Sequence, residues 1–388
     1  MEIIKNPEAV IAAIDVYLEK TDRKLEDELR SAGYVRTAEA VALINRLQDK
    51  LFRGVRKQTR DLVKTLKEAK ASGIGGKLLE GRIQNMMDGD DYGRTVEKAI
   101  QNLYQDNFKP IAGGYMSQAE KAFESGSRLT LDTIRERTRA WWTEWSKDLS
   151  NLMRINSQDD IWDLIYSSSE NGESLDKLIR RIMNGGWRSE YYQARRTAIT
   201  EVLRLHSVAA DEAIQQNPDV EEKEWVHTGA HKNEPRLNHV AISGQRVRKD
   251  LPFTLIGTLG GYYNPMYPRD TNLPAEETIN CHCICRAILG DLGGMSYDER
   301  RKLKQEHIKN DNREWMAERD RENRARAGID PDRVKVNWFE EKTPEQKALY
   351  LGGKKKMELY DRGYITTDAR LEHVRTSTLK QLRDEGLL

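Results

Sequence analysis

All three cysteines of this 388-residue chain lie in one short stretch, as Cys281, Cys283 and Cys285. Residues such as Thr278 and Ile284 favour an extended backbone, so the stretch is predicted to be a β-strand. Side chains alternate along a strand, which would place the three sulfur atoms on one face. Neighbouring cysteines at this spacing are poorly placed for a disulfide with each other, because their Cα atoms lie near the upper limit of the usual range.

Three interpretations of this cysteine cluster are open. Free cysteine packs readily in protein cores, so the sulfurs can be buried side chains without further chemistry. A disulfide or a reactive thiol is the second interpretation. The third is a zinc site, because thiolate and imidazole are common zinc ligands. The candidate zinc ligands are Cys281, Cys283 and His239, with His206 or His231 as the fourth.

The predicted strand also decides which histidine is left out of this site. Cys281 and Cys283 are expected on a strand near the centre of its sheet. His282, which lies between them, would then point to the opposite face. It is therefore excluded from the predicted zinc site.

A metal-dependent nuclease or hydrolase is the alternative function that these residue types suggest. A metal ion with an open coordination position activates water. The histidines that could join the cysteines are His227, His231, His239 and His282. However, the sequence has no His-Glu-x-x-His pair and no carboxylate cluster with metal-ligand spacing. A non-enzymatic role is therefore the first prediction.

The elements around the cysteines predict a small mixed domain. A helix over residues 189–216 precedes strands at 225–228 and 245–248, which a polar loop separates. We therefore expect an α+β chain with three parts. These are a long all-helical region over 1–190, a mixed α+β domain over 191–290 and a charged helical extension over 291–388.

The helical region contains one narrow apolar stripe. Its members recur at three- and four-residue steps, with charged and polar residues between them. They are Val41, Ile44, Leu47, Leu51 and Val55. No internal partner helix of matching length is obvious from the sequence. This region is therefore predicted to carry the contact with a partner protein.

Composition narrows the class of protein further. Charged residues make up 33% of the chain and hydrophobic residues 38%, and the formal net charge is +1. A general nucleic-acid coat would usually be more basic, so any contact with DNA must be local. No apolar run approaches the roughly 18 residues of a membrane span, and no signal peptide is expected. From this pattern we expect that the protein starts in the cytoplasm and that its cysteine thiols are reduced.

A series of short motifs runs through the predicted mixed domain in a fixed order. They are Thr200-Glu201, Trp225, Arg236-x-x-His239, Gly244, Pro268-Arg269-Asp270 and Asn280-Cys281-His282-Cys283. Their order and spacing resemble the Mu F-like domain of bacteriophage minor head, or head morphogenesis, proteins. In that family the usual string has an arginine before Thr-Glu, a Pro-Gly-Asp turn and Asn-Cys-Arg-Cys. This chain departs from it at Ile199, Arg269 and His282, and Arg195 is the candidate to replace the missing helix charge.

The resemblance implies a structural role without catalytic activity. Members of the family are few-copy components of the procapsid that associate with the portal vertex. The implied partners are the portal protein, the major capsid or scaffold protein, and phage DNA during packaging or ejection. The implied location is the virion, after assembly in the bacterial cytoplasm. With a net charge of +1, we expect DNA binding to be weak and sensitive to salt.

Overall fold

The computed structural model describes residues 21–89, 91–122, 128–183, 190–228, 235–290, 295–326, 339, 342–365 and 368–388. The chain forms two compact units, Met1–Lys309 and Asn310–Leu388. Long helices make up most of it, and short strands form small sheets, so the predicted α+β class is confirmed. The predicted division of the chain at residues 190 and 290 stays a prediction.

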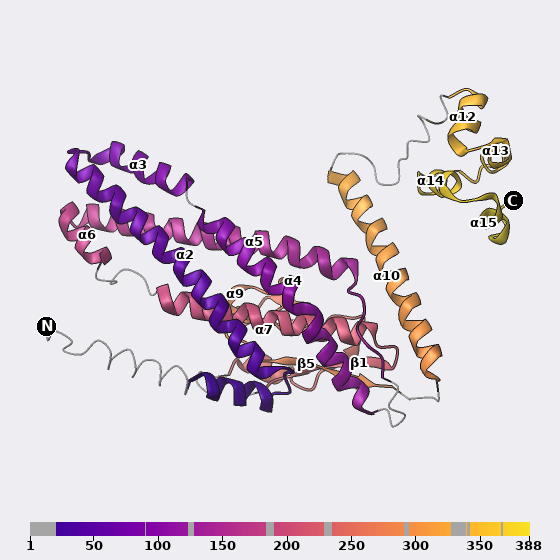
Figure 1. The fold of residues 1–388 in the computed structure, drawn as a ribbon, viewed down its shortest axis with the longest axis horizontal. Coiled ribbons are helices and arrows are strands. Elements are labelled where there is room, and N and C mark those ends of the chain that lie inside the picture. The colour runs from indigo at the N-terminus through magenta and orange to yellow at the C-terminus, as the bar shows by residue number, and fades with distance from the viewer. Residues whose placement is uncertain are drawn as a thin grey trace. The chain divides into compact units, whose positions relative to one another are not determined.

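Four long helices run side by side in the first unit (Figure 1). They are α2 (Thr37–Ala71), α4 (Tyr92–Ala119), α5 (Glu136–Glu170) and α7 (Glu190–Gln216). Helix α2 packs against α4 and α7, and α4 also packs against α5 and α7. Two shorter helices, α3 (Gly76–Asp88) and α6 (Leu175–Met183), pack against α2, and a short 3-10 turn, η1 (Glu120–Ala122), follows α4.

The apolar stripe of α2 has its partners inside the protein. All five members of the stripe are buried, in the same core as apolar residues of α4 and α7. The expectation that this stripe lacks an internal partner is therefore wrong. The complementary faces belong to helices distant in sequence, and the repeat along one helix does not show which distant faces will cover it.

A three-stranded antiparallel sheet lies beside the long helices. Its order is β2 (Arg246–Arg248), β1 (Val220–Val226) and β5 (Ile284–Leu289). A separate hairpin pairs β3 (Leu255–Ile256) with β4 (Tyr262–Tyr263). Two short helices, α8 (Leu237–Ala241) and α9 (Ala275–Thr278), lie in the connections. The strands expected at 225–228 and 245–248 correspond to β1, which begins earlier, at Val220, and to β2.

The stretch around the cysteines differs from the predicted strand. Pro274 is the N-cap of α9, and Glu277 lies in the first turn of that helix. Asn280 then adopts a positive φ of 56°, and β5 begins only at Ile284. Proline and acidic residues at a helix start outweigh the extended preference of Thr278. The central position in the sheet is wrong too, because β5 is an edge strand and β1 lies in the centre.

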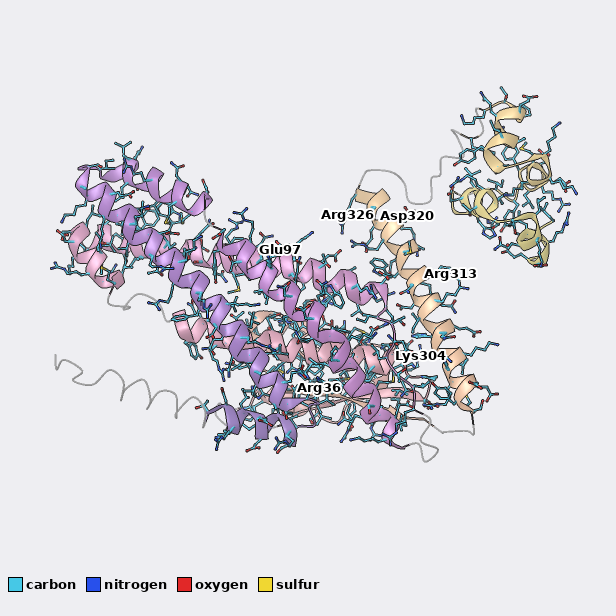
Figure 2. The ribbon with its side chains drawn as sticks, in the orientation of Figure 1. Arg36, Glu97, Lys304, Arg313, Asp320 and Arg326 are labelled. Carbon is cyan, nitrogen blue, oxygen red and sulfur yellow. The ribbon has the colours of Figure 1, made fainter. Side chains whose placement is uncertain are left out.

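Helix α10 (Tyr297–Arg326) carries charged side chains along its length. Figure 2 shows Lys304, Arg313, Asp320 and Arg326 on this helix. Its start is attached to the first unit through Arg300 and Lys304, and it continues into the second unit.

The second unit contains α12 (Pro344–Leu351), α13 (Lys354–Asp361), α14 (Asp368–Thr376) and α15 (Leu379–Asp384). These helices surround an apolar core of their own, which includes Phe339, Leu359 and Val374. Within the described ranges of both units, the helices are too short or too polar to cross a membrane.

Candidate functional site

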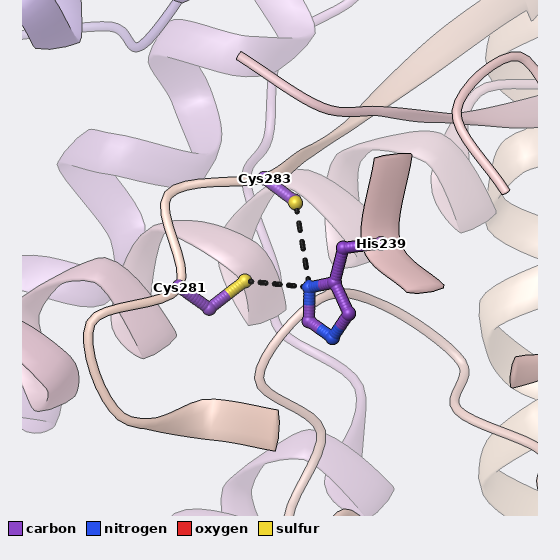
Figure 3. A group of neighbouring side chains, drawn as sticks. All are labelled: His239, Cys281 and Cys283. Carbon is purple, nitrogen blue, oxygen red and sulfur yellow. Dashed lines mark hydrogen bonds between the residues drawn. The ribbon is translucent and has the colours of Figure 1, made fainter. Parts of the chain in front are cut away.

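His239 lies beside two cysteine sulfurs (Figure 3). Its Nδ1 atom is 3.6 Å from Sγ of Cys281 and 3.6 Å from Sγ of Cys283. All three side chains are buried, and their potential ligand atoms lie within 4.8 Å of one another. His239 comes from α8, and the cysteines come from the segment between α9 and β5. The fold thus brings together the three residues singled out as candidate zinc ligands.

Glu277 orients the imidazole ring from its other side. Its Oε2 lies 2.9 Å from Nε2 of His239. The buried carboxylate also accepts hydrogen bonds from the backbone N–H and hydroxyl of Thr258 and from the side-chain amide of Asn238. Burial raises the pKa of Glu277, but these hydrogen bonds and His239 outweigh burial and lower it. The carboxylate of Glu277 faces Nε2 of His239, so the other ring nitrogen, Nδ1, faces the two sulfurs.

Arg269 fixes the backbone of both cysteines. Its guanidinium donates to the carbonyl of Cys281 at 2.5 Å and to the carbonyl of Cys283 at 3.0 Å. The same group donates to the hydroxyl of Ser207 at 2.6 Å and to that of Tyr34 at 3.0 Å. The Tyr34 hydroxyl in turn lies 3.2 Å from the carbonyl of Cys283. Arg269, together with Ser207 and Tyr34 from distant parts of the chain, therefore holds this segment in place.

The three thiols differ in their readiness to ionise. The hydrogen bond with Cys283 lowers the pKa of Cys281 well below its ordinary value, and His239 and Arg269 act in the same direction. The same hydrogen bond, together with burial, raises the pKa of Cys283 well above its ordinary value. Burial raises the pKa of Cys285 to about 12. Cys281 therefore becomes a thiolate most readily, and Cys285 acts as a packing residue in the apolar cluster of the sheet.

His227 approaches the cluster from the end of β1. Its Nδ1 lies 3.5 Å from Sγ of Cys283, and its side chain is half-buried. Burial lowers the pKa of His227, which favours the neutral imidazole. From the sequence, His227 entered only the hydrolase hypothesis, and Glu277 entered none. The signal for Glu277 was its place in the first turn of a proline-capped helix directly before the cysteines.

Of the two histidines considered as a fourth ligand, the structure describes His206, which does not join this group. His206 packs edge-on against Tyr34 and Tyr115, and its Nδ1 lies 3.1 Å from the Tyr115 hydroxyl. It is not among the described side chains whose ligand atoms gather around His239. His231 lies outside the described residues. The backbone carbonyl of His282 accepts a hydrogen bond from the hydroxyl of Thr228.

His206 is expected to make the protein less stable in acid. Burial and the charge of Arg269 lower its pKa to about 3, whereas an unfolded histidine titrates near pH 6.5. Between these values the unfolded state binds an extra proton. The free energy of unfolding therefore decreases by about 1.4 kcal/mol for each unit by which the pH is lowered. His206→Gln removes this contribution. Urea unfolding of both proteins from pH 7 to 4 checks it, and parallel pH profiles would contradict the expectation.

Comparison with known proteins tests the family resemblance. Residues 159–286 match the family described as Phage Mu protein F like protein. The Mu F-like resemblance is therefore confirmed. A Bacillus subtilis (strain 168) protein described as uncharacterized protein YqbB is 29% identical over 228 residues, 58% of this chain and 72% of that protein. No solved structure matches the chain significantly.

The Mu F-like match begins within α5 and ends within β5. It therefore includes α6 and α7 as well as the sheet and the His–Cys group. The family match indicates a protein of phage head morphogenesis.

The Thr-Glu pair of the Mu F-like motif lies in the core. The carboxylate of Glu201 accepts hydrogen bonds from the indole of Trp145 at 2.8 Å and from the hydroxyl of Tyr104 at 3.2 Å. Nε of Arg204 lies 3.3 Å from the same carboxylate, as the three-residue spacing on the helix predicted. The hydroxyl of Thr200 donates to the backbone carbonyl one turn earlier. Glu201 therefore joins α7 to α4 and α5.

Arg195 does not replace the arginine that the Mu F-like motif usually has on this helix. Its guanidinium donates to Asp22 and Asn45 and thus ties α7 to the segment before α2 and to α2 itself. The cation beside Glu201 is Arg204. The expectation for Arg195 is therefore corrected.

Other Mu F-like motif residues shape the surroundings of His239. Trp225 is fully buried, and its ring packs edge-on against that of His239 with centroids 5.5 Å apart. Gly244 has a positive φ of 88°, which favours glycine, and its N–H donates to the carbonyl of Trp225 at 2.8 Å. Arg236 donates to the carbonyl of Ile279 at 2.5 Å. These residues connect α8 to β1 and to the segment before the cysteines.

The Pro-Arg-Asp motif forms a buried turn. Pro268, Arg269 and Asp270 are all buried. The carboxylate of Asp270 accepts hydrogen bonds from the backbone N–H groups of Met266 and Asn272, and burial raises its pKa. Arg269 has a φ of 64°, a conformation that favours glycine, the residue of the family's usual motif. This chain therefore places a large cation where the backbone geometry favours glycine.

Proposed function

We propose that this protein is a minor head protein that associates with the portal during procapsid assembly and is carried in the virion, with a role in DNA packaging or ejection. The observation that carries the proposal is the Mu F-like match over residues 159–286. The buried motif residues support it, because they connect helices and strands as structural residues do.

The geometry gives less support to the hydrolase alternative. A catalytic zinc site keeps one coordination position open to water and substrate. His239, Cys281 and Cys283 are exposed by only 1%, 3% and 2%. Such burial is typical of a structural site.

The portal contact needs a surface other than the buried stripe of α2. One exposed apolar surface lies on α8 and the β3–β4 hairpin, and we call it the α8–hairpin surface. Its members are Leu237, Ile256, Leu259 and Tyr262, with exposed fractions of 82%, 52%, 83% and 78%. Contiguous exposed apolar side chains mark protein contacts in soluble proteins.

Three observations connect Leu237, Ile256 and Tyr262, and Leu259 lies in the turn between β3 and β4. Leu237 and Ile256 line the same groove, which has a volume of about 580 Å³. Ile256 pairs with Tyr262 across the hairpin, so their side chains lie on one face. The side-chain amide of Asn238 donates to the carbonyl of Ile256 at 3.0 Å and holds α8 against the hairpin. We therefore propose that the α8–hairpin surface contacts the portal.

The double variant Leu259→Asp with Tyr262→Asp is expected to bind purified portal protein at least about 30-fold more weakly than the unchanged chain. The reason is that a hot-spot residue at the centre of an interface, often a tyrosine, costs about 2 kcal/mol or more when it is replaced, which corresponds to about 30-fold in affinity. Leu78→Asp is the matched control, because Leu78 is 72% exposed on α3 and is not a member of this surface. Affinity is measured by pull-down or surface plasmon resonance with full-length proteins.

The two parts of the proposal fail differently. If the unchanged chain does not bind the portal and does not sediment with procapsids, the portal association is refuted. If it binds and the double variant binds equally well, only the assignment of the α8–hairpin surface is refuted. A loss of binding in the Leu78→Asp control would show that the effect is not specific to this surface.

A further inference from the structure

Two cysteine sulfurs converge on one ring nitrogen of His239. A neutral imidazole whose Nε2–H donates to Glu277 has one lone pair on Nδ1. Two sulfurs, those of Cys281 and Cys283, lie at the same distance of 3.6 Å from that single nitrogen. One lone pair accepts one good hydrogen bond, and Cys281 and Cys283 also hydrogen-bond to each other, so the nitrogen and the two sulfurs form one compact group of potential ligand atoms.

The distances match the edges of a metal coordination tetrahedron. Zinc binds cysteine sulfur at about 2.3 Å and histidine nitrogen at about 2.0 Å, which separates the two ligand atoms by about 3.5 Å in ideal tetrahedral geometry. The two sulfur–nitrogen distances around His239 are 3.6 Å, and Sγ of Cys283 lies 3.5 Å from Nδ1 of His227. A cation bound among these atoms would therefore need little rearrangement of the first three ligands.

The groups around the cluster also suit a metal site. Metal-binding histidines usually donate their other N–H to a carboxylate, which is the role of Glu277 beside His239. Arg269 holds the carbonyls of Cys281 and Cys283, so both sulfurs are positioned in advance. A divalent cation with two thiolates is also neutral overall, which limits the cost of burying it.

We propose that Cys281, Cys283, His239 and His227 bind one zinc ion that joins the segment before β5 to α8 and β1. His227 is the fourth ligand and turns inward on binding, because its Nδ1 already contacts Cys283 but lies outside the tight group of three. The site is structural, since its first three ligands are buried. This inference goes beyond the portal association and does not depend on it.

Metal content is the first test. Full-length protein purified without a histidine tag is expected to contain close to one zinc per chain by plasma mass spectrometry, and Cys283→Ala is expected to contain none. Cys285→Ala is the matched control, because it removes another buried thiol, two residues from Cys283, that is not one of the proposed zinc ligands. A chelator is expected to lower the melting temperature of the unchanged chain and of Cys285→Ala.

The fourth ligand is tested by cobalt. Cobalt(II) in place of zinc is expected to give the visible absorption of a tetrahedral site with two thiolates. In His227→Ala the thiolate absorption stays and the metal dissociates more readily, because water takes the fourth position. Glu277→Gln is expected to weaken metal affinity about 10- to 100-fold. Glu276→Gln is its exposed neighbour and control and should keep the affinity of the unchanged chain.

Several results would overturn the proposal. One is protein without zinc that also takes up no cobalt or zinc when titrated with either metal. Another is metal that remains bound in Cys283→Ala. A melting temperature that does not respond to the chelator while zinc leaves the protein would also refute the structural role. Because these readouts include the unchanged chain, they decide the question even if a variant fails to fold.

Discussion

Replacing Arg300 with methionine is expected to lower the free energy of unfolding of the first unit by about 3 to 5 kcal/mol. Arg300 donates to both carboxylate oxygens of Glu120 at 2.7 Å and to Asp219 at 2.5 Å. The side chains of these three residues are exposed by 3%, 0% and 2%. Removing the cation leaves two carboxylates buried without it, and uncompensated buried charge is strongly destabilising.

Urea unfolding followed by fluorescence measures this effect. Arg301→Met is the control, because the neighbouring arginine is exposed and its loss should change the free energy by no more than about 0.5 kcal/mol. Removing the stranded charges as well, with Glu120→Gln and Asp219→Asn, is expected to recover part of the loss. A cost below about 1 kcal/mol for Arg300→Met alone would show that the buried network contributes little.

Arg269→Ala is expected to lower the free energy of unfolding by about 3 to 5 kcal/mol. The variant loses four hydrogen bonds, leaves the carbonyls of Cys281 and Cys283 without this donor, and creates a cavity where a fully buried side chain lay. Arg269→Gly loses the same hydrogen bonds but adopts the φ of 64° without strain. It is therefore expected to be about 1 kcal/mol more stable than Arg269→Ala.

The control for both changes is Arg248→Ala, which removes an arginine whose side chain is 68% exposed and pairs with Asp250. A surface ion pair contributes at most about 1 kcal/mol, so this variant should unfold almost like the unchanged chain. The comparison is made by urea unfolding with zinc in excess. If Arg269→Gly proves as stable as the unchanged chain, the guanidinium contacts contribute no net stability.

Local features of this fold could be predicted from the sequence. The helices follow from the spacing of apolar residues. The contact of Glu201 with Arg204 follows because residues three apart lie on the same face of a helix. The approach of His239 to Cys281 and Cys283 was predictable because a family motif carries their order. Each of these inferences rests on residues near in sequence or on a known motif.

Contacts between distant segments could not be predicted. The apolar stripe of α2 is buried by α4 and α7. The side chain of Arg269 is positioned by Tyr34, which lies 235 residues earlier in the chain. His227 reaches Cys283 only because β1 pairs with β5 in one particular register. Hydrophobic periodicity describes the face of each element and leaves its partner open.

The long separation between such partners also sets the time at which the first unit can be completed. Tyr34 contacts the carbonyl of Cys283, which is 249 residues further along the chain, and Glu120 pairs with Arg300, 180 residues later. At about 5 to 20 residues per second, the ribosome needs roughly 12 to 50 s to deliver the partner of Tyr34. During that interval the apolar faces of the first helices are made before the residues that close the core. The first unit can therefore close only after the chain has been made as far as Arg300, and until then the apolar faces of its first helices lack part of their cover.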